Sequence, residues 1–188
     1  MAKFGLSYPV VALLDVTTGT YSGGKVLSKA CAVTVTPQYA ESSLEADDDA
    51  EAEHLKDFTK ADVSLEVSNL TAEDETLLFG HKVETDDIVY NGADQGSYVG
   101  LGYITRRRVD GKTTYQPVWL LKVLFAEGAD ENKSSGENLT LESHKLSGTA
   151  SVGKDGQWKR ASKTTFDTKA EAQAWLKKKA GITEDAAA

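Results

Sequence analysis

Two long β-type runs that meet at a tight turn constrain this chain more than any other feature. Both runs lie within Tyr98–Phe125, and they meet at Asp110-Gly111. An Asp-Gly pair between β-rich runs is a strong hairpin signal, because both residues tolerate the positive φ values that such turns require. The second run, Val118-Trp-Leu-Leu-Lys-Val-Leu-Phe125, is apolar on both faces, so both faces need a cover. One cover is the chain's own core, and the other could be a second copy of the same chain, with Trp119 at that second face.

Further segments predict a mainly β protein with two short helices. Strands are expected where apolar residues are frequent or alternate with polar ones, at 6–14, 25–36, 62–69, 87–90 and 139–152. In the second of these, Cys31 shares its parity with Val33 and Val35, which predicts a buried thiol. Helices are expected at 71–80, capped by Thr71 and stopped by Gly80, and at 166–181, with a Thr168/Glu171 capping box and a stop at Gly181. This pattern indicates a β-sandwich or partly closed barrel with a mid-chain helix and a C-terminal helix.

The length of 188 residues fits a single domain, expected at 1–182, with a mobile loop at 127–137 and a frayed tail at 183–188. The single cysteine excludes an internal disulfide. The apolar run at 10–14 is bounded by Pro9 and Asp15, too closely for a secretory signal, so synthesis in the cytoplasm is expected. No apolar stretch is long enough to predict a membrane span.

The acidic charge of the chain is concentrated in one segment. The net charge is −8, and a stretch without any base holds seven of the carboxylates: Glu41, Glu45, Asp47, Asp48, Asp49, Glu51 and Glu53. Clustered like charges favour a solvated acidic loop, which we place at 41–56. A calcium loop starting at Asp47 fails, because Ala52 stands where a glycine is needed and Phe58 where a carboxylate is needed. The loop could instead dock on bases of a neighbouring subunit, either Arg106–Arg108 or Lys177–Lys179.

Residues for catalysis are hard to find. The three histidines, His54, His81 and His144, are dispersed and are expected at the surface. Gly100-Leu-Gly102 lies within a strand pattern, which indicates a bulge or a close approach of the backbone. Arg106, Arg107 and Arg108 precede the hairpin turn, with the first and third on one face; they are interpreted as a solvated tip, as partners of a neighbouring subunit, or more weakly as a DNA contact. We therefore expect no catalytic residue, no metal and no cofactor.

Several segments, taken in order, resemble the major tail protein family, the tail tube proteins of long-tailed, non-contractile phages of Gram-positive bacteria. The resemblance covers most of the chain and rests on these segments: Tyr8-Pro-Val-Val-Ala-Leu, Leu44-Glu-Ala-Asp-Asp48, Leu70-Thr-Ala-Glu-Asp-Glu-Thr-Leu-Leu-Phe-Gly-His81, Val99-Gly-Leu-Gly-Tyr103, Val118–Phe125, Trp158 and Phe166–Trp175.

The resemblance implies a virion structural protein and no enzyme. Subunits of this family are β-sandwiches that form hexameric rings, and the rings stack into a hollow tail tube through which DNA is ejected. In such a tube the acidic segment Glu41–Glu53 would either join neighbouring rings or line the lumen. The implied partners are other copies of the chain, a tape-measure protein, tail-end proteins and transiting DNA that is not bound by sequence. No membrane partner is implied, and the family offers no catalytic residues to carry over.

Two other functions remain open from the residues. A monomeric β-sandwich that binds a carbohydrate or a host surface would need aromatic side chains on a flat face, and the candidates are Tyr90, Tyr98, Tyr103, Tyr115 and Trp158. An enzyme is the weakest alternative, because no nucleophile with its base and no metal set is visible.

Overall fold

The computed structural model describes residues 2–46, 49–109, 111–127 and 143–182, and the chain in these ranges is mainly β. Its elements, in order, are β1 (Ala2–Leu14), β2 (Tyr21–Val26), β3 (Ala30–Ala46), β4 (Asp49–Val67), α1 (Ala72–Phe79), β5 (Lys82–Glu84), β6 (Asp87–Val89), β7 (Val99–Val109), β8 (Lys112–Ala126), β9 (His144–Ser151), β10 (Lys159–Ala161) and α2 (Lys169–Ala180). The expected loop at 127–137, apart from Glu127, and the expected tail at 183–188 lie outside the described residues.

Nearly all strands join one antiparallel sheet in the order β2-β1-β7-β8-β9-β4-β3, with β10 added beside β8. β5 and β6 form a separate small hairpin. The sheet is not closed into a barrel, because β2 and β3 stand at its two ends without pairing to each other. The prediction of a mainly β fold with a mid-chain helix and a C-terminal helix is therefore confirmed, in its open, sandwich-like form.

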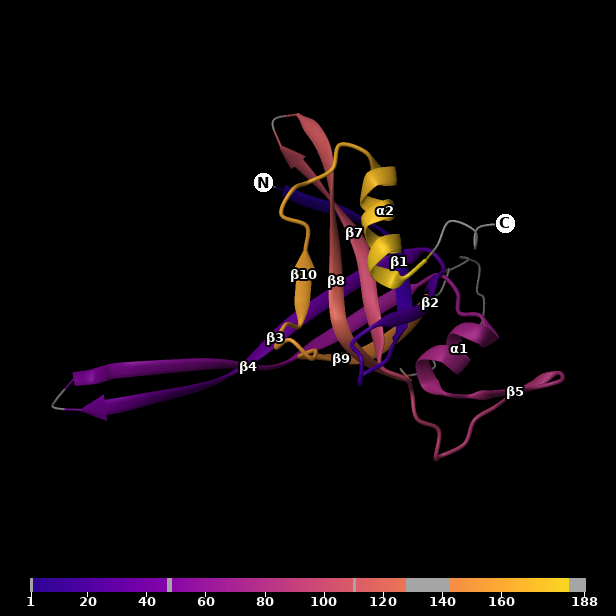
Figure 1. Ribbon diagram of the computed structural model, residues 1–188, viewed down its shortest axis with the longest axis horizontal. Coiled ribbons are helices and arrows are strands. Elements are labelled where there is room, and N and C mark those ends of the chain that lie inside the picture. The colour runs from indigo at the N-terminus through magenta and orange to yellow at the C-terminus, as the bar shows by residue number, and fades with distance from the viewer. Residues whose placement is uncertain (1, 47–48, 110, 128–142, 183–188) are drawn as a thin grey trace, which may run out of the picture.

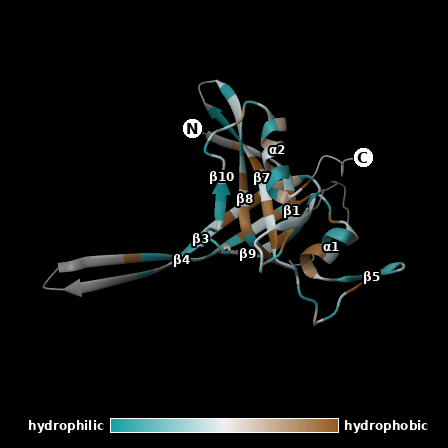
Figure 2. Ribbon diagram, viewed as in Figure 1, coloured by the Kyte–Doolittle hydropathy of each residue, from teal (hydrophilic) through white to brown (hydrophobic). Residues whose placement is uncertain are grey.

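The sheet bends on itself, so that β3, β4 and β9 cross over β7 and β8 (Figure 1). The inner core lies between these two parts and includes Val63 and Leu65 from β4, Leu101 from β7 and Leu120 from β8. Apolar residues accordingly dominate the middle of β7 and β8 in Figure 2. A second cluster lies on the other face of β1, β7 and β8, where α2 covers the sheet. The two faces of β8 are thus buried by different parts of the same chain.

The predicted hairpin is present as β7 and β8, which pair down to Val109 opposite Lys112. Gly111 in the turn has a φ of 82°, as the Asp-Gly signal requires. Both the bulge and the close approach expected at Gly100-Leu-Gly102 are confirmed. The register shifts between Val99 and Leu101, and the ring of Trp119 packs directly against the backbone of the two glycines. A Cβ added at Gly100 would lie 2.3 Å from the ring of Trp119, and one at Gly102 would lie 2.7 Å from it.

Two expectations near the N-terminus are wrong. The single strand expected at 25–36 is two strands, because the chain crosses from β2 to β3 through Leu27, whose N–H donates to the carbonyl of Pro9. Cys31 is exposed and not buried, since the register of β3 shifts between Ala30 and Ala32. This extra residue in the strand turns the thiol away from the face that Val33 and Val35 share.

Both helices begin and end where their capping residues predict. Thr71 and Asp74 form a capping box at the start of α1, and Thr168 and Glu171 form one at the start of α2. Gly80 and Gly181 end the two helices in the left-handed conformation. Asp74 has a second role, because its buried carboxylate lies 2.7 Å from the Nζ of Lys25 on β2. This contact ties α1 to the edge of the sheet.

Replacing Asp74 with asparagine is expected to lower the free energy of unfolding by about 1–3 kcal/mol, because it leaves the Lys25 ammonium without its buried partner. Burial opposes ionisation of Asp74, but hydrogen bonds from Lys25 and Thr71 outweigh it and hold the pKa of this carboxyl below its ordinary value. The stabilisation is thus present above about pH 4 and disappears as the pH falls through the lowered pKa. Urea denaturation of D74N and of the unmodified protein at neutral and acidic pH measures this difference. Glu73→Gln, at an exposed neighbour, is the control and should change stability by less than about 0.5 kcal/mol.

Candidate self-association arm

A long β-hairpin extends from the body of the molecule and is its most unusual feature (Figure 1). The last residue pair between β4 and β9 is Ala61 with Ala150, and beyond it β4 pairs with β3 alone. We call residues 37–60 the arm. At about 3.3 Å per residue, the ten residues 37–46 give it a reach of roughly 30 Å. The arm corrects the expected acidic loop at 41–56, because 41–46 and 49–56 lie in paired strands.

Three aromatic rings fix the root of the arm. Tyr39 and Phe58 face each other across the two strands, with ring centroids 5.9 Å apart. Phe58 stacks in turn on Trp158, at 4.7 Å and with an angle of 9° between the ring planes. Trp158 belongs to the segment between β9 and β10, and it packs against the inner core together with Phe58. The core therefore continues into the base of the arm and sets its direction.

Farther along the arm, away from its root, the two strands are joined by backbone pairing and polar side-chain contacts in place of a hydrophobic core. Lys56 lies 2.6 Å from the carboxylate of Glu41, and its ammonium also lies 4.7 Å from the ring centroid of Tyr39. Hydrogen bonding to Glu41 raises the pKa of Lys56. Glu41 is exposed and in a strand, whereas the side chains of Glu45, Asp47, Asp48, Asp49, Glu51 and Glu53 lie outside the described residues. Of the large apolar side chains, Leu55 stands out on the arm, with 61% of its surface exposed.

The three arginines lie in β7 near the hairpin turn, and their alternation is as expected. Arg106 and Arg108 are exposed, and Arg107 is half-buried on the other face. The guanidinium of Arg106 lies 5.2 Å from the ring centroid of Phe4 in β1. The structure does not bring these arginines to the arm within one chain, because the β7–β8 tip and the arm leave the body in different directions (Figure 1).

Trp119 is not at a free surface, so its expected contact with a neighbouring subunit is wrong. Trp119 is 1% exposed and packs against Leu176 of α2 in the second cluster, between α2 and the sheet, which we call the outer cluster. The ring of Tyr21 meets it edge-on at 5.1 Å. The apolar residues on both faces of β8 are therefore buried within the chain, by α2 on one face and in the inner core on the other.

The five aromatic residues proposed for a carbohydrate platform do not share a face. Tyr103 is buried in the inner core, whereas Tyr115 packs against the outer cluster on the opposite side of the sheet. Trp158 is engaged with Phe58, which leaves Tyr90 and Tyr98 as the exposed members.

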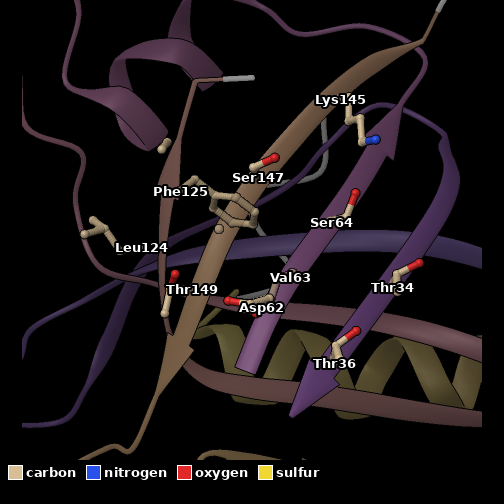
Figure 3. Close-up of a pocket in the computed structure, with 12 residues that line it drawn as sticks. Thr34, Thr36, Asp62, Val63, Ser64, Leu124, Phe125, Lys145, Ser147 and Thr149 are labelled. Atoms are coloured by element: carbon tan, nitrogen blue, oxygen red, sulfur yellow. The ribbon is translucent and has the colours of Figure 1, made fainter. Parts of the chain in front are cut away.

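A shallow groove of about 570 Å³ lies on the outer face of β3, β4, β9 and the end of β8 (Figure 3). Its walls carry small hydroxyl side chains, among them Thr34, Ser64 and Thr149, with Asp62 and Lys145 as charged members. The carboxylate of Asp62 accepts a hydrogen bond from the amide of Gln38 and lies 3.3 Å from the ammonium of Lys60.

His81 is the residue that sequence reasoning missed. It was expected at the surface, but its side chain is 5% exposed and lies between Asp94 and Glu127. The two carboxylates contact opposite nitrogens of the ring, so the three groups cannot converge on one ion. Within the described residues, no other group of three or more His, Cys, Asp or Glu side chains is placed to hold a metal either. The only local signal was the position of His81 directly after the buried end of α1.

Comparison with protein-family models and with curated proteins finds no match for this chain. Within the described ranges, no helix is both long and apolar enough to span a membrane. The features that bear on function are the arm, the charges around it and the order of the sequence segments.

Proposed function

We propose that this protein is a virion structural subunit that self-assembles into hexameric rings, and that the rings stack as the tail tube of a long-tailed phage. The observation that carries the proposal is the arm. A two-stranded hairpin alone is marginally stable in water, and its strand edges attract other strands. Because this arm is long and has a hydrophobic core only at its root, contact with another subunit would stabilise it.

The chemistry around the arm supports an assembly role over a catalytic one. Arg106 and Arg108 are exposed near the tip of the β7–β8 hairpin, which points away from the arm. We expect them to pair with the acidic residues on the arm of another copy. Such a contact joins two different surfaces of the subunit, and this head-to-tail type of contact generates rings or filaments. The concentrated acid charge also suits a conduit that passes DNA without holding its phosphates. The order of tail-tube-like segments in the sequence supports the same proposal.

Sedimentation velocity over a range of protein concentrations tests this proposal. The unmodified chain is expected to form larger species as its concentration rises. Leu55→Lys places a charge on the exposed arm and is expected to weaken association at least tenfold, a loss of about 1.4 kcal/mol. Val83→Lys is the matched control, because Val83 is a β5 residue that is 53% exposed and far from the arm. A chain that stays monomeric at every concentration, or equal losses in both variants, would contradict the proposal.

A further inference from the structure

The buried His81 cluster joins three parts of the chain that are distant in sequence. His81 lies between α1 and β5, Asp94 lies in the link between β6 and β7, and Glu127 directly follows β8. The Nδ1 of His81 lies 2.9 Å from the Oδ2 of Asp94, and the Nε2 contacts the Oε1 of Glu127. The ring therefore bridges two carboxylates across its whole width.

This geometry requires a particular protonation state. A carboxylate only accepts hydrogen bonds, and a neutral imidazole has one N–H to donate. Both contacts are hydrogen bonds only when both ring nitrogens carry a proton, and then the ring is positively charged. Burial opposes that charge, but the hydrogen bonds to Asp94 and Glu127 outweigh burial and raise the pKa of His81 above its ordinary value.

The other groups around the His81 ring are two aromatic rings, a carboxylate and a lysine. The ring of Tyr90 lies 4.4 Å from that of His81, and the hydroxyl of Tyr90 donates to Glu75 of α1. The ring of Phe79 lies 5.6 Å away. The pKa of Asp94 is lowered chiefly by a hydrogen bond from the N–H of Asn91, then by the hydrogen bond with His81, and least by the charge of Lys82 in β5.

We propose that the proton on His81 is a latch that fastens the end of β8 to the link between β6 and β7, and that losing the proton releases Glu127. After deprotonation the ring keeps one N–H, and Asp94 is the partner that retains it. Asp94 is already held by the N–H of Asn91, and its side chain is 12% exposed, whereas that of Glu127 is 53% exposed and has water as an alternative partner.

The latch acts where the backbones are already close. A Cβ added at Gly96 in the link would lie 2.3 Å from the carbonyl oxygen of Leu78 in α1 and 3.2 Å from that of Phe125 in β8. The link thus lies against both elements, and freeing Glu127 removes the side-chain contact by which His81 joins the end of β8 to the link. Because the pKa of His81 is raised, the latch is fully closed below the ordinary imidazole value and opens as the pH rises through the raised one.

Exchange of the imidazole C2 hydrogen, measured by mass spectrometry on the full chain, gives the pKa of each histidine in any assembly state. The pKa of His81 is expected to lie above the ordinary value of an imidazole, and Glu127→Gln is expected to lower it. Backbone amide exchange at 125–127, corrected for its intrinsic pH dependence, should speed up severalfold above the His81 midpoint. In E127Q this step should be absent, and His144→Gln should leave both readouts unchanged.

Two results would overturn the latch. One is a His81 pKa at or below the ordinary value of an imidazole in the unmodified chain. The other is amide exchange at 125–127 that does not change across the His81 midpoint. Glu127 is exposed and lies outside both hydrophobic clusters, so its substitution tests the latch without threatening the fold. The latch is independent of the proposed assembly, because both readouts can be taken on a single subunit.

Discussion

A chain whose arm has been cut back is expected to fold normally and to lose self-association. The variant replaces residues 41–56 with Asn-Gly, which joins Ala40 to its cross-strand partner Asp57 through a two-residue turn. It keeps the stacked rings of Tyr39, Phe58 and Trp158, so the inner core stays closed. In the part of 41–56 that the structure describes, the removed strands pair only with each other, so the melting temperature should change by no more than a few degrees. Sedimentation velocity should then show a monomer at concentrations where the unmodified chain assembles.

The control for this variant shortens the small β5–β6 hairpin. Replacing residues 84–87 with Asn-Gly joins Val83 to its partner Ile88 and leaves Tyr90 and His81 in place. This chain is expected to assemble like the unmodified one. If the chain without its arm assembled equally well, the role proposed for the arm would be wrong.

Trp119→Ala is expected to cost about 3–5 kcal/mol in the free energy of unfolding, the usual range for removing a fully buried large aromatic side chain. The loss of stability has two causes. The indole fills the space above Gly100 and Gly102, where the backbone has no side chain of its own to replace it. The same ring supports Leu176, so its removal also loosens α2 from the sheet. Urea denaturation followed by circular dichroism measures the change.

A loss of this size approaches the whole stability of many small domains, so Trp119→Phe provides a milder test of the same site. Trp175→Ala is the matched control, because Trp175 is half-buried on α2 and its ring lies 5.5 Å from the ammonium of Lys179. The control should lose clearly less than the buried site. If Trp119→Ala instead left the subunit stable and weakened self-association alone, Trp119 would lie at an interface, as its sequence pattern first indicated.

The parts of the fold that could be predicted are those with local signals. The Asp-Gly turn set the β7–β8 hairpin, and the alternation of Val63, Leu65 and Val67 set the buried face of β4. Capping boxes set the starts of both helices. In each case the residues that decide the structure lie within a few positions of one another, so their spacing carries the information.

The errors come from contacts between distant segments. Trp119 was correctly expected to need a second cover, but that this cover is α2, some fifty residues later, depends on the bend of the whole sheet. The acidic residues suggested a loop because like charges repel, yet a hairpin pairs the backbone and still leaves the side chain of Glu41 in water. His81 was missed because Asp94 and Glu127 are 13 and 46 positions away, which no spacing motif connects.

Negative-stain electron microscopy of the concentrated, unmodified protein tests the central claim most directly. The arm and the resemblance together predict rings, or tubes of uniform width built from stacked rings. The arm-shortened chain, prepared in the same way, should show neither. A field of separate single subunits from the unmodified protein, at concentrations where sedimentation also finds only monomer, would contradict the account.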